Sequence, residues 1–148
     1  MSTAKQIALR VSAALWVVWG LVHMLAGFIV LTSDASAGFQ AIADAVEPGL
    51  LQGNYHEAVG GILNQHGWNL AWFGLTTVVG AVFIWQANRT AIWVTALIGG
   101  LADVGYLLFV DLPGYVNFFP GTVMTLVSGS AIALSFWVWL SGSDEAES

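Results

Sequence analysis

The sequence contains no cysteine and very few charged residues. Without cysteine (Cys 0), disulfides, thiolate metal sites and thiol redox chemistry are all excluded. Only 8% of the residues are charged, whereas an ordinary soluble domain has roughly a quarter. A soluble fold with so little charge could not cover its surface, so the natural solvent for this chain is lipid.

Basic residues are scarcer still, with Lys and Arg numbering 3 against 9 Asp and Glu, for a formal net charge of −6. This balance argues against a nucleic-acid partner, whose phosphates require clustered cations. The sequence has no phosphate-binding loop, dinucleotide fingerprint, nucleophile elbow or HExxH motif. It therefore points to no enzyme class and leaves open whether there is any catalysis.

Long apolar segments are what the chain does have. It is 57% hydrophobic, and its mean hydropathy is +0.77. Each of four runs approaches the ~20 residues that a helix needs to cross a bilayer, where only helices satisfy the backbone of such segments. We predict an all-α, polytopic membrane protein with one four-helix transmembrane domain over residues 1–142. Its helices are expected at about residues 7–31, 68–85, 91–110 and 118–140, and an acidic disordered tail at residues 143–148.

The three basic residues predict the orientation in the membrane. Lys5 and Arg10 precede or begin the first apolar run, and Arg89 lies between the second and third runs. With four crossings they fall on the same side, and the positive-inside rule makes that side cytoplasmic. We therefore expect a multi-pass protein of the cell membrane with both termini in the cytoplasm.

The long outer connection, Thr32–Gly67, is expected to contain a short amphipathic helix. Four apolar residues recur there at helical spacing and end near a proline and a glycine: Phe39, Ile42, Val46 and Leu50. Such a helix would lie in the membrane interface.

The stretch "GGLADVGYLL" places an aspartate, Asp103, inside an apolar run, where an ionisable residue is a functional hypothesis by default. His23 lies in the first run. By the helical rise, His23 is ~12 Å and Asp103 ~10 Å below the outer ends of their helices. We expect the two to interact directly in an inward-facing site. Asn69 and Tyr106 would join them, with His66 at the outer mouth.

Several uses of this site remain open. The leading prediction is binding of a small amphipathic molecule, such as a quinone or a lipid head group, within a redox assembly or a homo- or hetero-oligomer. The main alternative is a structural subunit in which His23 and Asp103 only clamp helices together. A small transporter would need a continuous polar lining, which the cytoplasmic half lacks. Haem is disfavoured because His23 and His66 differ in depth by ~12 Å. No metal site is predicted, since no zinc-like spacing is present.

At "WGLVHMLAGF", Trp19 to Phe28, the chain resembles the first helix of DoxX-like small bacterial membrane proteins. The four-helix layout with compact loops is also similar. DoxX is linked to a membrane-bound thiosulfate:quinone oxidoreductase, so the resemblance implies a quinone-facing membrane subunit. It implies no catalytic residue in this chain.

Overall fold

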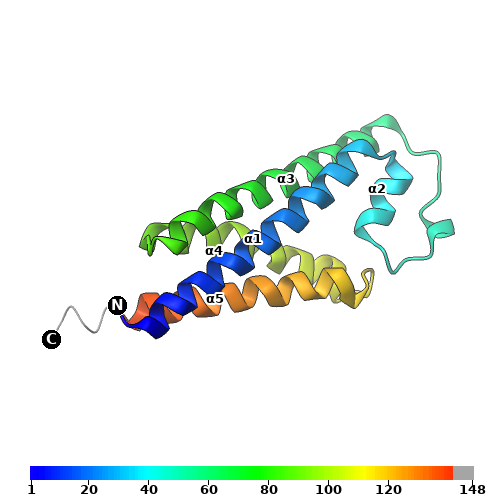
Figure 1. Cartoon of the computed structure of the whole chain (residues 1–148). Helices are drawn as coiled ribbons and strands as arrows, with labels where there is room; N and C mark the ends of the chain where they lie inside the picture. The colour runs from blue at the N-terminus through cyan, green and yellow to red at the C-terminus, as the bar shows by residue number, and fades with distance from the viewer. Residues whose placement is uncertain (142–148) are drawn as a thin grey trace.

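The chain folds into four long helices, and one short helix covers one end of them (Figure 1). The structure, a computed structural model, describes residues 1–141, so the predicted tail at 143–148 lies outside the described residues. The long helices are α1 (Thr3–Thr32), α3 (Glu57–Trp85), α4 (Arg89–Tyr106) and α5 (Val123–Ser141). A π-helical turn, η2 (Leu107–Asp111), extends α4, and another, η3 (Phe118–Thr122), precedes α5.

All 4 long helical segments, including their π-helical extensions, are long and apolar enough to span a membrane. Their outer surfaces carry many exposed large apolar side chains, for example Leu21, Leu25 and Phe28 along α1. These side chains suit a lipid environment, where an apolar surface costs nothing. The predicted class, an all-α multi-pass membrane protein with a four-helix bundle, is confirmed.

The second membrane helix begins at Glu57 rather than at the predicted Trp68. His56 caps it, because its Nδ1 accepts a hydrogen bond from the Ala58 N–H at 3.1 Å. The negative charge of Glu57 in the first turn also suits the positive end of the helix dipole. The apolar run alone did not reveal this start, because a pair of glycines and the polar stretch from Asn64 to His66 interrupt it.

The predicted short helix of the outer connection is present as α2 (Ala35–Ile42). Asp34 caps its start by accepting a hydrogen bond from the Ala37 N–H at 2.9 Å. It ends earlier than predicted, so only Phe39 and Ile42 of the predicted apolar face belong to it. Leu50 lies in a separate 3₁₀ turn, η1 (Pro48–Leu50), and is 77% exposed.

Three hydrogen bonds tie the segment after α2 to the α4–α5 turn, one of them from the Asn117 side-chain amide to the Asp44 carbonyl at 3.1 Å. The Asn117 N–H donates to the Asp44 carboxylate at 2.7 Å, and the Ala45 N–H donates to the Tyr115 carbonyl at 3.1 Å. The outer connection therefore spans from the α1–α3 side of the bundle to the α4–α5 side. This is why α2 lies over the end of the bundle and does not project from it.

Glycines bring α1 and α3 into backbone contact. A Cβ added at Gly20 would collide with the carbonyl of Gly74, and one added at Gly27 would collide with the carbonyl of Gly67. The members of each helix are seven residues apart, which is about two turns, so both glycines of a helix lie on the same face. Small residues at such crossings let membrane helices approach closely. The two pairs fasten α1 to α3 along most of their length.

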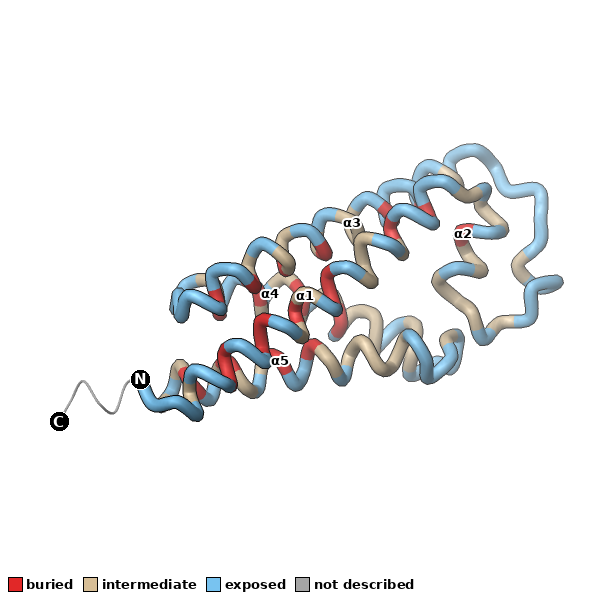
Figure 2. Tube along the Cα trace, viewed as in Figure 1, coloured by how far each residue is buried: buried red, intermediate tan, exposed pale blue. Residues whose placement is uncertain are grey.

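Burial differs between the two ends of the bundle (Figure 2). The buried residues of α4 end at Asp103, and those of α5 begin at Ser128. By contrast, α1 and α3 remain buried against each other as far as Val30 and Leu63. The bundle is therefore densely packed at the end that carries the N-terminus, here called the terminal end. It opens at the other end, the α2 end, where α4 and α5 lean away from α1 and α3 (Figure 1).

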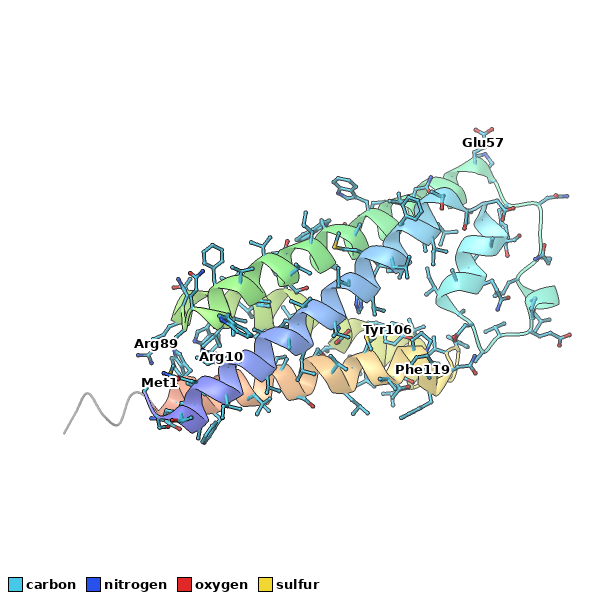
Figure 3. All side chains as sticks on the ribbon, viewed as in Figure 1. Met1, Arg10, Glu57, Arg89, Tyr106 and Phe119 are labelled. Atoms are coloured by element: carbon cyan, nitrogen blue, oxygen red, sulfur yellow. The ribbon has the colours of Figure 1, made fainter. Side chains whose placement is uncertain are left out.

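Charge also separates between the two ends, as Arg10, Arg89 and Glu57 illustrate in Figure 3. At the terminal end the Lys5 ammonium donates to the Ser141 carbonyl at 3.0 Å, and both arginines lie 5.2 Å from a tryptophan ring centroid. The predicted gathering of all three basic residues at one end is confirmed. Apart from Asp103, every Asp and Glu among residues 1–141 lies toward the α2 end.

Candidate ligand-binding cavity

A cavity of about 490 Å³ occupies the open end of the bundle. The sides of the cavity are formed by α1, α3, α4 with η2, and η3 with the start of α5. Its mouth is covered by the end of α2 and by Asp44. Its walls are mainly apolar and aromatic, with a few polar groups. The lining includes Val22, His23, Ile42, Asp44, His66, Leu70, Phe73, Asp103, Gly105, Tyr106, Phe109, Gly121 and Met124. A concave, mostly apolar pocket with a few polar groups is the usual form of a small-molecule site.

Asp103 forms the inner polar end of this cavity, and three helices hold it there. Its Oδ2 accepts a hydrogen bond from the indole N–H of Trp19 on α1 at 2.8 Å and another from the hydroxyl of Ser128 on α5. The residue itself belongs to α4 and is 4% exposed. Its second oxygen, Oδ1, accepts no hydrogen bond from the described residues and is the one that faces His23.

His23 lies beside this free carboxylate oxygen, with its Nε2 3.9 Å from Asp103 Oδ1. The two residues thus lie side by side, but no direct hydrogen bond joins them as the predicted direct interaction would suggest. Its ring stacks on Trp19, with the centroids 3.5 Å apart, and its Nδ1 lies 2.8 Å from the Trp19 carbonyl oxygen. A carbonyl oxygen can only accept, so Nδ1 must carry the hydrogen of this bond. In the neutral ring Nε2 is then a hydrogen-bond acceptor.

The structure places two more of the predicted residues on the same cavity. Tyr106 lies between the two sides of the bundle, toward the α2 end, as Figure 3 shows. His66 lines the wall formed by α3. Predicted to lie at the mouth before the helix begins, His66 is instead within α3, because that helix starts earlier.

Asn69, also predicted for the site, does not line the cavity. Its side-chain oxygen accepts a hydrogen bond from the Trp72 indole at 3.1 Å, in an exposed position. The cavity face of α3 is marked by His66, Leu70 and Phe73, which follow the helical repeat. Since each residue turns the helix by about 100°, Asn69 points to the side of that face.

Two residues that hold Asp103 were not predicted as site residues. Trp19 is fully buried. A buried indole N–H nearly always has an acceptor, so its position one turn before His23 was a usable signal. Ser128 is one of several serines and threonines on α5, and nothing in the sequence distinguishes it from the others. Asp44 could not be placed, because the path of the outer connection was unknown.

The polar groups of the cavity do not converge as metal ligands. Among residues 1–141 no group of three or more His, Cys, Asp or Glu side chains is arranged to hold a metal ion. What the site offers is a pair of adjacent acceptor atoms at the inner end of an apolar chamber. Such an arrangement can bind the polar head of a molecule whose body is apolar.

Comparison with known proteins adds no family to this description: no family model matches the chain, and no curated protein or solved structure is significantly similar to it.

Proposed function

We propose that this membrane protein binds a small amphipathic molecule in the cavity at the α2 end of the bundle. The observation that carries the proposal is the cavity of about 490 Å³ whose inner end is formed by Asp103 and His23. The apolar walls suit the body of the molecule, and the two side chains suit its head. Lipids combine an apolar body with a polar head in this way, and so do quinones, which are the ligand class implied by the DoxX-like resemblance.

The orientation that we propose places the cavity mouth on the outer side of the membrane. All three basic residues lie at the terminal end, and basic residues near helix ends favour the cytoplasm. Both termini are then cytoplasmic, and the cell membrane is the natural location. The ligand would be drawn from the outer leaflet or from the space beyond it.

One observation favours a purely structural role instead. Asp103 accepts hydrogen bonds from α1 and α5 while belonging to α4, so it cross-links three helices. Buried polar cross-links of this kind stabilise membrane bundles without binding anything. A cross-linking role accounts for the two hydrogen bonds that Asp103 Oδ2 accepts. It does not account for the cavity next to Oδ1.

A matched pair of glycine substitutions separates the two roles. Gly105 lines the cavity and Gly129 lies exposed on α5, and an added Cβ would meet nothing within 4 Å at either position. We expect Gly105→Phe to fill the cavity and abolish the co-purification of a small molecule, measured by native mass spectrometry of gently purified protein. Gly129→Phe should retain the bound molecule.

The purely structural role of Asp103 would be supported if neither the unmodified protein nor the Gly129→Phe variant carried a bound molecule. Equal retention by the Gly105→Phe variant would instead place the ligand outside this cavity. Thermal unfolding of both variants supplies the folding control.

A further inference from the structure

The inner polar end of the cavity presents two acceptors, while the hydroxyl of Tyr106, a donor in the same lining, lies against Gly121 on the η3 side. Asp103 Oδ1 and His23 Nε2 face each other at 3.9 Å, which is too far for a direct hydrogen bond. Trp19, which could have donated, already gives its N–H to Asp103 Oδ2. A ligand head group that satisfies both atoms must therefore bring two hydrogens of its own.

The site also lacks a positive charge. The three Lys and Arg side chains are all at the terminal end, and His23 is an acceptor in its neutral form. A carboxylate that is removed from water without a counter-charge is strongly destabilised, whereas a partner cation repays much of that cost. The missing cation is thus a second property expected of the ligand.

The rest of the cavity favours a cation as well. Asp44 lines the mouth, and neither lysine nor arginine is among the described residues that line the cavity. Three aromatic rings line the walls: Phe73, Tyr106 and Phe109. The faces of such rings attract cations, and they do so most strongly where water is excluded. An anionic head group would meet repulsion from both carboxylates.

We infer that the head group bound at this site is a protonated primary amine, so that the ligand is an alkyl- or arylalkylammonium amphiphile. One N–H donates to Asp103 Oδ1 and a second to His23 Nε2, while the ammonium charge pairs with the carboxylate. The carbonyl groups of an oxidised quinone could only accept, and they would leave both atoms unsatisfied. This inference rests on the proposed function and specifies the ligand class of the same cavity.

Three water-soluble probes that share a 4-phenylbutyl group and differ only in the head group test which head group the cavity prefers. They are 4-phenylbutylamine, 4-phenylbutanol and 4-phenylbutyltrimethylammonium, which offer a cation with N–H donors, a neutral donor, and a cation without donors. Binding is measured by titration calorimetry on the protein in zwitterionic lipid nanodiscs, with empty nanodiscs subtracted. We expect the amine to bind at least tenfold more tightly than either of the other probes.

Two variants link this preference to the cavity. Asp103→Asn should reduce the affinity for the amine at least tenfold and bring it level with the alcohol. Gly105→Phe should abolish binding of all three probes, and Gly129→Phe should change none. Should Asp103→Asn fail to fold, the ranking of the three probes on the unmodified protein still decides the question.

The outcomes distinguish this inference from the proposed function. If the alcohol binds as tightly as the amine and Gly105→Phe abolishes both, the cavity binds amphiphiles and the ammonium inference is wrong. If the trimethylammonium probe equals the amine, charge alone is recognised, and the donor argument is wrong. If none of the probes binds and no small molecule co-purifies, the proposed function fails together with the inference.

Discussion

Asp103 divides its two oxygens between two tasks. Oδ2 receives the Trp19 indole and the Ser128 hydroxyl, so it holds the helices together. Oδ1 remains available beside His23 and the cavity. The structural and the binding interpretations of this residue therefore concern different atoms, and each can be tested by a substitution that leaves the other atom in place.

At Trp19 we predict that Trp19→Phe lowers the free energy of unfolding by about 1–3 kcal/mol. Phenylalanine keeps most of the packing but removes the donor to a buried carboxylate oxygen. The control is Trp68→Phe, the same substitution at a position that is 63% exposed, and it should stay within about 0.5 kcal/mol of the unmodified protein. Reversible unfolding in mixed micelles measures both. Equal effects would mean that the Trp19 hydrogen bond contributes nothing to stability.

The close approach of Asp103 and His23 could be predicted because depth within a membrane helix follows from counting residues. The rise per residue is fixed, and both helices run in the same direction, so equal distances from the outer ends imply equal levels. Direction around the helix is harder to predict for α3. Asn69 and Leu70 are neighbours in sequence, yet only Leu70 faces the cavity, and an apolar environment on all sides leaves no amphipathic pattern that marks the inner face.

At the scale of the helix, glycine positions decide how closely α1 and α3 pack. A Cβ at Gly74 would meet the backbone of Gly20 and Met24, which cannot move without separating the helices. Gly61, on the same helix, has open space around an added Cβ. The two glycines therefore allow a comparison in which residue type, helix and substitution are all the same.

We predict opposite outcomes for the two substitutions. Gly74→Ala should destabilise the protein by about 1–3 kcal/mol, as overpacking of a core does. Gly61→Ala should be neutral or stabilising by up to about 1 kcal/mol, because alanine is the better helix former. The unfolding assay used for Trp19 measures both changes. A Gly74→Ala variant as stable as Gly61→Ala would show that the two helices do not touch at this crossing.

The limits of the helices were predictable only where composition changes sharply. The ends of α1, α4 and α5 agree with the apolar runs to within a few residues. For α3 the first turns resembled a loop, because three glycines and the polar stretch from Asn64 to His66 interrupt the apolar residues between Glu57 and Gly67. The capping of its start by His56 has no strong sequence signature. The same difficulty affected α2, whose apolar spacing continued in the sequence beyond the point where the helix ends.

At the scale of the whole molecule, the separation of charge predicts the topology. Because the chain has no cysteine, single cysteines can be introduced without background labelling. In intact bacterial cells, a membrane-impermeant maleimide should label Gly53→Cys, in the outer connection. It should label Gln86→Cys, between α3 and α4, only after the cells are permeabilised. The reverse pattern would place the cavity mouth in the cytoplasm and remove the outer leaflet as the ligand source.

The α1–α3 contact also has a consequence for biosynthesis. Both partners of its glycine pairs precede Arg89 in the chain, so this hairpin can close in the membrane while α4 is still being made. Asp103 then enters on α4, and the Ser128 donor arrives only with the last helix. Until α5 docks, the carboxylate has half of its hydrogen bonds and one wall of its chamber is missing. The cavity is thus the last part of the protein to be completed, and until then Asp103 lacks one of its two hydrogen-bond donors.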